Sequence, residues 1–136
     1  MVTRNELRDL AQLRLREAAA LFDAELYDGC VYLCGYVVEL ALKARICAIL
    51  DIVEYPETRH FKTHDFDELK LLAGLQREIT LEGNPELFKY WSAATEWKPE
   101  WRYQPSGTYD RTYAEMILAA IRAEPHGVLA CISRRW

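Results

Sequence analysis

The chain contains 136 residues, of which 51% are hydrophobic and 28% are charged, and its formal net charge is −4. This length favours a single domain, residues 1–136, that folds around one hydrophobic core. The acidic balance argues against a protein that holds DNA through its overall electrostatic field, because such proteins are basic. No apolar run approaches the ~20 residues needed to span a bilayer, and MVTRNELRDL lacks the apolar core of a secretion signal. We therefore expect a cytoplasmic protein that does not associate with membranes.

The first helix is marked by Thr3 and Glu6, which have the spacing of a capping box. Apolar residues then recur at helical spacing as far as about Leu26, which is typical of a surface helix with one buried face. The residues of this apolar stripe are Leu7, Leu10, Ala11, Ala18, Leu21 and Phe22.

The second helix is predicted from Gly29 to Leu50, with Asp28 as its N-cap. Its sequence is apolar nearly all round, which is typical of a helix at the centre of a bundle. Glu39 and Lys43 are exceptions, and their i, i+4 spacing favours an ion pair. If Glu39 is buried, it needs a cationic or hydrogen-bonding partner, because an unpaired buried charge is costly.

Later helices are marked by capping residues and by helix breakers, and no segment shows a strand pattern. The sequence therefore predicts an all-α protein, an up-and-down antiparallel helical bundle of four to five main helices plus a short C-terminal helix. The signals are Asp65 with Glu68 and then Gly74 for the third helix, Asn84 with Pro85 for a fourth that ends near Thr95, Thr108 and Pro125 for the start and end of the fifth, and Val128, Leu129 and Ile132 for the last.

The four cysteines are Cys30, Cys34, Cys47 and Cys131. Cys30 and Cys34 lie one helical turn apart, but no second close cysteine or histidine pair completes a tetrahedral metal site. We interpret all four as small buried thiols, and we expect neither a metal nor another cofactor.

The segment EWKPEWRYQPSGTY, residues 96–109, concentrates Trp97, Trp101, Arg102, Tyr103 and Tyr109 in a connector that cannot be a regular helix. Two interpretations stay open. In one, the rings form a pocket in which Arg102 meets an anion and an aromatic ring stacks on a base. In the other, the rings close one end of the bundle, and Arg102 pairs internally with Glu39.

Three stretches resemble the HEPN family. LFDAELYDGCVYLCGYVVELALKARI is similar to the family's first helix-turn-helix, HDFDELKLL to its next helix, and WRYQPS to the Arg-Tyr connector of many non-catalytic members. The likeness runs from about residue 7 to residue 133, so we expect the chain to form one HEPN-like domain. In the first stretch it rests on Tyr32, Gly35, Tyr36, Glu39, Leu42 and Lys43.

The resemblance implies a helical bundle that is often a homodimer and that works beside nucleotides or RNA. It also implies a nucleotidyltransferase-type partner, or a toxin–antitoxin or phage-defence setting. On this basis we expect a binding or interaction module without catalytic activity. The expected ligand-binding residues are Arg102, Tyr103, Glu39, Lys43, Trp101 and Tyr109.

Catalytic HEPN members resemble one another in a motif of an arginine, four to six residues and a histidine, often followed by a tyrosine. The histidine moves protons, and the arginine holds phosphoryl oxygens. Here Arg102 matches the arginine, but Gly107 stands where the histidine is wanted, before Thr108 and Tyr109. Glycine cannot transfer a proton, which argues against a ribonuclease at this site.

Two alternatives to a binding module stay open. The first is a metal-independent endoribonuclease toxin that uses Arg59 and His64, which have the spacing of the catalytic motif but precede the third helix. This enzyme would need His64 to face an open cleft with Arg59 nearby. The second alternative is a purely structural subunit without a ligand. The binding module instead requires an aromatic-lined cavity around Arg102 with no imidazole in reach. Trp136 at the chain end suggests a dimer or partner surface.

Overall fold

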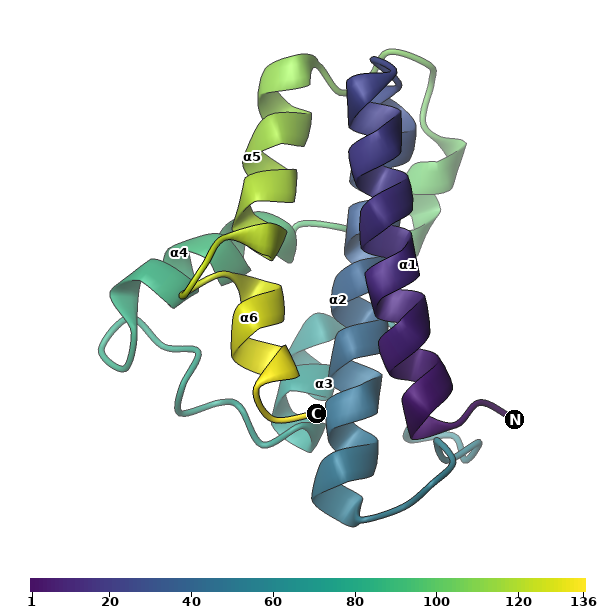
Figure 1. Cartoon of the computed structure of the whole chain (residues 1–136), viewed down its shortest axis with the longest axis vertical. Helices are drawn as coiled ribbons and strands as arrows, with labels where there is room; N and C mark the ends of the chain where they lie inside the picture. The colour runs from purple at the N-terminus through teal and green to yellow at the C-terminus, as the bar shows by residue number, and fades with distance from the viewer.

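The computed structural model describes residues 1–136 as an all-helical domain without a β-strand, which confirms the predicted fold class (Figure 1). Its elements are α1 (Arg4–Asp23), α2 (Tyr27–Leu50), α3 (Phe66–Leu72), α4 (Pro85–Ala94), the 3₁₀ turn η1 (Pro99–Tyr103), α5 (Arg111–Arg122) and α6 (Val128–Ser133). None of these helices combines the length and the apolar character that crossing a membrane would need.

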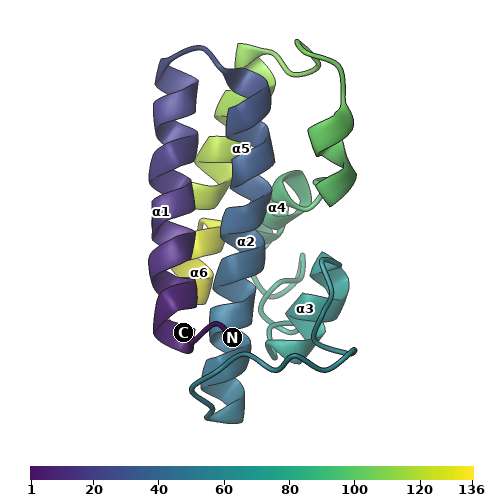
Figure 2. The ribbon, with the colours of Figure 1, turned by 90° about the vertical axis from the view of Figure 1, so that its right-hand side faces the viewer.

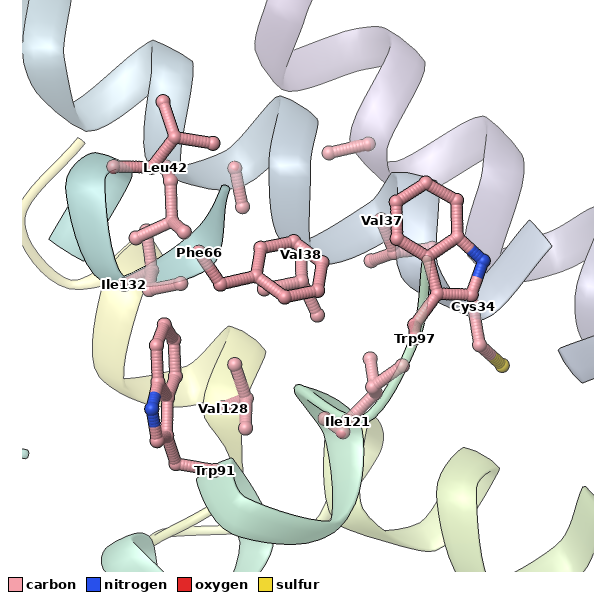
Figure 3. Packing of buried hydrophobic residues seen from close by; sticks show 14 of the residues in the cluster. Cys34, Val37, Val38, Leu42, Phe66, Trp91, Trp97, Ile121, Val128 and Ile132 are labelled. Carbon is pink, nitrogen blue, oxygen red and sulfur yellow. The ribbon is translucent and has the colours of Figure 1, made fainter. Parts of the chain in front are cut away.

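The helix α2 is the centre of the bundle, as its apolar sequence predicts. It forms an antiparallel hairpin with α1, while α5 and α6 pack along the hairpin (Figures 1 and 2). The helix α3 and the connector that contains η1 lie on another side of α2 (Figure 2). Side chains from α2, α3, α4, α5 and α6 meet in one core around Phe66, Trp91 and Trp97 (Figure 3). All four cysteines are buried, as interpreted from the sequence, and none forms a disulfide.

Two of the predicted helix starts are confirmed by their capping hydrogen bonds. The Thr3 hydroxyl accepts from the Glu6 backbone N–H, and the Glu6 carboxylate accepts from the Thr3 N–H at 2.7 Å. The Asn84 side chain accepts from the Leu87 N–H at 3.1 Å, with Pro85 at the first helical position. These contacts span three residues, so the local sequence is enough to specify them.

Asp65 caps α3 as predicted, but the reciprocal half of its expected capping box is wrong. The Asp65 carboxylate accepts from the backbone N–H groups of Asp67 and Glu68. The Glu68 carboxylate accepts instead from the Thr63 hydroxyl, at 2.6 Å. This hydroxyl in turn accepts from the Asp65 N–H at 3.0 Å, so Thr63 takes the place of Glu68 at the cap.

Three helix boundaries differ from their predicted positions. The helix α1 ends at Asp23 rather than near Leu26, because Glu25 adopts a φ of 63°. The helix α5 begins at Arg111 rather than near Thr108, with Asp110 as its N-cap. The helix α2 begins at Tyr27 without a side-chain cap, so the prediction of Asp28 as N-cap is wrong.

Trp136 packs on the core of its own chain, although the sequence suggested a dimer or partner surface. Its indole is half-buried against the core. The Arg8 guanidinium donates to the carbonyl of Trp136, and Arg45 Nη1 donates to the carbonyl of Arg135 at 2.9 Å. Contacts within the chain therefore account for the position of this residue.

Candidate ligand-binding pocket at Arg102

The connector between α4 and α5 is anchored at its start by Trp97. Its indole is 5% exposed, and Nε1 donates to the carbonyl of Tyr32 at 3.0 Å. The ring lies edge-on to Tyr36, with centroids 4.9 Å apart, and fills the space above Gly35, where a Cβ atom would overlap it. Figure 3 shows the indole against α2, near Cys34 and Val37. A glycine within α2 therefore lets the connector approach this helix closely.

The other end of the connector is held by Asp28. One carboxylate oxygen accepts from the Gly107 N–H at 2.6 Å, and the other accepts from the Tyr109 N–H at 2.8 Å. Gly107 adopts a φ of +82°, a conformation that favours glycine. Asp28 thus fixes the segment before α5 instead of capping α2, a role that only a contact between distant residues could reveal.

A pocket of about 310 Å³ lies between these two anchors, where the connector faces the first turns of α2. Three aromatic rings and one guanidinium line it, and no histidine does. It therefore meets the requirement for a binding module stated from the sequence. The lining residues are Asp28, Gly29, Tyr32, Trp101, Arg102, Gln104, Thr108 and Tyr109.

Arg102 presents its guanidinium at this pocket without an acidic partner within ion-pair distance. The group is exposed and lies 4.9 Å from the centroid of the Tyr103 ring. Hydrogen bonding to the hydroxyls of Tyr103 and Tyr32 raises the pKa of Arg102, so it stays cationic. Both oxygens of the nearby Asp28 carboxylate already accept backbone hydrogen bonds. An anion can therefore bind to Arg102 without first displacing a salt bridge.

One wall of the pocket belongs to a row of stacked rings. Trp101 and Tyr109 have centroids 5.1 Å apart, and Tyr109 stacks on Tyr113 at 4.9 Å with an interplanar angle of 21°. The Tyr113 hydroxyl donates to the Glu96 carboxylate at 3.0 Å. Burial raises the pKa of Tyr109 and of Tyr113, so both phenols stay neutral near physiological pH. The row gives the wall a fixed, uncharged aromatic surface.

Glu39 is buried, with 4% of its surface exposed, and it has the partners that its burial requires. Lys43 Nζ donates to one carboxylate oxygen at 3.2 Å, and His64 Nδ1 lies 2.5 Å from the other. Of the two interpretations left open for Arg102, the internal pair with Glu39 is the one that does not form. Glu39 lies seven positions after Tyr32 of the pocket on α2, which corresponds to about 10 Å along the helix axis.

The six residues expected to bind a ligand thus divide into two groups. Arg102, Trp101 and Tyr109 line the pocket, and Tyr103 packs beside it against Arg102. Glu39 and Lys43 form a separate cluster with His64, outside the lining of the pocket.

Sequence reasoning did not assign five of the lining residues to the pocket: Asp28, Gly29, Tyr32, Gln104 and Thr108. Tyr32 carries the one available signal, since it precedes Tyr36 by a helical turn and precedes Glu39 by two, so all three share one face of α2.

His64 and Arg59 do not converge on one cleft. His64, whose side chain is 55% exposed, lines a cleft of about 360 Å³ between α3 and residues 95–100. Arg59 lines a different groove, of about 490 Å³, on the outer side of α3. The geometry that an Arg59–His64 endoribonuclease would need is therefore not formed within one chain.

Comparison with models of known protein families finds one match: the model of the HEPN domain matches residues 5–123. This range covers α1, apart from its first residue, through α5 and contains the whole lining of the Arg102 pocket. No curated protein and no solved structure matches the chain.

Proposed function

The chain belongs to the HEPN domain family, and from this premise we propose that it is a helical binding module whose pocket at Arg102 takes a nucleotide or the end of an RNA strand. The observation that carries the proposal is an unpaired guanidinium at the edge of a pocket lined by Tyr32, Trp101 and Tyr109. Arginine binds phosphate through parallel hydrogen bonds, while aromatic side chains stack on bases of any sequence.

Binding without cleavage is the activity that this pocket supports. Cleavage of RNA without a metal needs a group that moves protons near neutral pH, and the pocket has no imidazole. Tyr109 does not replace an imidazole, since burial raises its pKa. Gly107, at the position of the family's histidine, holds its backbone against Asp28.

We further propose that the module acts as a homodimer in the cytoplasm, with a nucleotidyltransferase-type partner, in a toxin–antitoxin or defence system. Membership of the family supports this setting. Light scattering on the purified chain tests the dimer. Co-purification with a nucleotidyltransferase encoded by a neighbouring gene tests the partner.

Replacing Arg102 with alanine should weaken the binding of AMP or of a short oligouridylate about tenfold or more, because charge-assisted hydrogen bonds contribute roughly 1.5–3 kcal/mol. The melting temperature should change little, since the side chain is exposed and has no ion-pair partner. Isothermal titration calorimetry and thermal unfolding measure the two effects.

Lys98→Ala is the matched control, because it removes a cation from the same connector but from the cleft beside His64. It should leave nucleotide affinity unchanged. Binding that is equal in wild type and Arg102→Ala would refute the pocket. The absence of any nucleotide binding would favour a structural subunit.

The endoribonuclease is a second candidate, favoured by one observation. The buried Glu39 carboxylate lies 2.5 Å from His64 Nδ1 and so orients an imidazole that lines an open cleft. A carboxylate that fixes a histidine in this way is a common device for proton transfer. Arg59 has no part in this version of the hypothesis, because it lines a different groove.

The endoribonuclease predicts that the purified chain cuts oligoribonucleotides without added divalent ions and that His64→Ala abolishes cutting. Under our proposal we expect no cutting by wild type. Gel analysis of a labelled oligoribonucleotide measures both proteins. Cleavage that disappears in His64→Ala but persists in Arg102→Ala would establish the second candidate in place of the first.

A further inference from the structure

The groove that Arg59 lines, here called the α3 groove, is separate from the Arg102 pocket and from the cleft at His64. It is an open groove of about 490 Å³ between a turn at residues 58–62 and the outer face of α3. It shares no lining residue with the Arg102 pocket. Its lining residues are Arg59, His60, Lys62, Thr63, Glu68, Leu71 and Leu72.

The cations of the α3 groove are not neutralised by the protein itself. Arg59 and Lys62 are exposed, and neither forms an ion pair. The one carboxylate in the lining, Glu68, accepts a hydrogen bond from the Thr63 hydroxyl at 2.6 Å. On a chain with a net charge of −4, this groove therefore presents a local excess of positive charge.

Two leucines give the groove its aliphatic surface. Leu71 is 62% exposed on α3, and Leu72 beside it is half-buried against the core. A leucine exposed to this extent, in a lining that also contains two unpaired cations, gives the groove both apolar and charged surface. This arrangement is typical of the anatomy of protein interfaces.

The groove is preformed, since its two sides are fixed by hydrogen bonds. The Tyr55 hydroxyl donates to the carbonyl of Phe61 at 2.8 Å, and these two rings pack edge-on. On the other side, the Thr63 hydroxyl donates a hydrogen bond to the Glu68 carboxylate and accepts one from the Asp65 N–H at the start of α3. A partner would therefore bind without first having to order this surface.

We propose that the α3 groove binds an acidic segment of a partner protein, with an apolar side chain of that segment covering Leu71 and carboxylates pairing with Arg59 and Lys62. The lining favours a peptide over a nucleic acid. It contains no tryptophan, tyrosine or phenylalanine on which a base could stack, and its one ring is the imidazole of His60. The exposed leucine in the lining has no counterpart in a phosphate backbone. This inference does not rest on the ligand of the Arg102 pocket.

The test uses the full chain and a fluorescein-labelled synthetic peptide of Asp, Glu and Leu residues, with binding measured by fluorescence anisotropy. We expect binding that weakens as salt is added. The double variant Arg59→Glu/Lys62→Glu should weaken it about tenfold or more. Leu71→Ser should weaken it several-fold without changing the salt dependence, because it removes the apolar contact alone.

The control variant is Arg16→Glu/Lys89→Glu, which has the same net charge but reverses two exposed cations on α1 and α4. It should bind the peptide nearly as well as wild type. Equal losses in the two double variants would overturn the proposal, because bulk charge would then explain binding. No binding by wild type would also overturn it. A third outcome would assign the groove to nucleic acid instead. In that outcome the wild type binds a labelled oligouridylate but not the peptide, and Arg59→Glu/Lys62→Glu abolishes this binding.

Discussion

Gly35→Ala should destabilise the domain by about 2–3 kcal/mol, although alanine favours a helix over glycine by about 1 kcal/mol. The new methyl group would overlap the indole of Trp97, which sits against α2 and has only 5% of its surface exposed. Either the ring leaves its site and gives up its hydrogen bond to the carbonyl of Tyr32, or the connector moves away from α2. Chemical denaturation followed by circular dichroism measures the change.

Gly29→Ala is the control for this prediction, because it places the same methyl group in the same helix. There the nearest atom is the flexible end of Leu21, at 3.1 Å, so the substitution should be neutral or slightly stabilising. A Gly35→Ala variant as stable as Gly29→Ala would contradict the close packing of the connector on α2. If the packing is right, Gly35→Ala should also weaken ligand binding at Arg102, since Trp97 anchors the segment that carries Arg102.

Glu39→Leu should destabilise the domain by about 3 kcal/mol, because it leaves the ammonium group of Lys43 without its carboxylate. The Lys43 side chain is 15% exposed and lies 3.2 Å from Glu39. Its Nζ atom is also 5.3 Å from the centroid of the Tyr55 ring. A lost salt bridge at the surface would cost well under 1 kcal/mol, so the predicted size depends on the burial of Glu39. Urea unfolding at neutral pH measures it.

A double-mutant cycle separates the cost of the unpaired charge from the value of the pair. Glu39→Leu with Lys43→Met removes both charges, and we expect this variant to be more stable than Glu39→Leu alone. His64→Ala should cost about 1 kcal/mol or less, since its imidazole is half exposed and Lys43 still pairs with Glu39. Equal stability of wild type and Glu39→Leu would show that the carboxylate is not needed for the fold.

The two predictions concern one face of α2, on which Tyr32, Gly35, Tyr36, Glu39 and Lys43 lie. Trp97 covers the first part of this face, and His64 binds at the second. The pocket at Arg102 and the cleft at His64 therefore lie on either side of Trp97, and the connector lines both. A ligand assay on Arg102→Ala and a cleavage assay on His64→Ala probe neighbouring but different sites.

The sequence by itself determined which segments are helical and where the irregular connector lies. The caps at Thr3 and Asn84 are hydrogen bonds between residues three positions apart, so a short stretch of chain contains all the information. The apolar run of α2 determined its central position in the same way, because a helix without a polar face must be buried. The connector stood out because its prolines cannot continue a helix and because it concentrates aromatic residues.

Only the tertiary structure decided which distant groups meet. The sequence offered Lys43 as a partner for Glu39 and, in one interpretation, also Arg102. The Lys43 pair forms, but packing brought His64 to the second carboxylate oxygen in place of Arg102. Asp28 resembled a helix cap, yet its carboxylate binds backbone groups near residue 108. Arg102 was consequently left unpaired beside the pocket. The burial of Glu39 requires that its charge has a partner. Which of several suitable partners it has depends on which one the packed chain brings within about 3 Å.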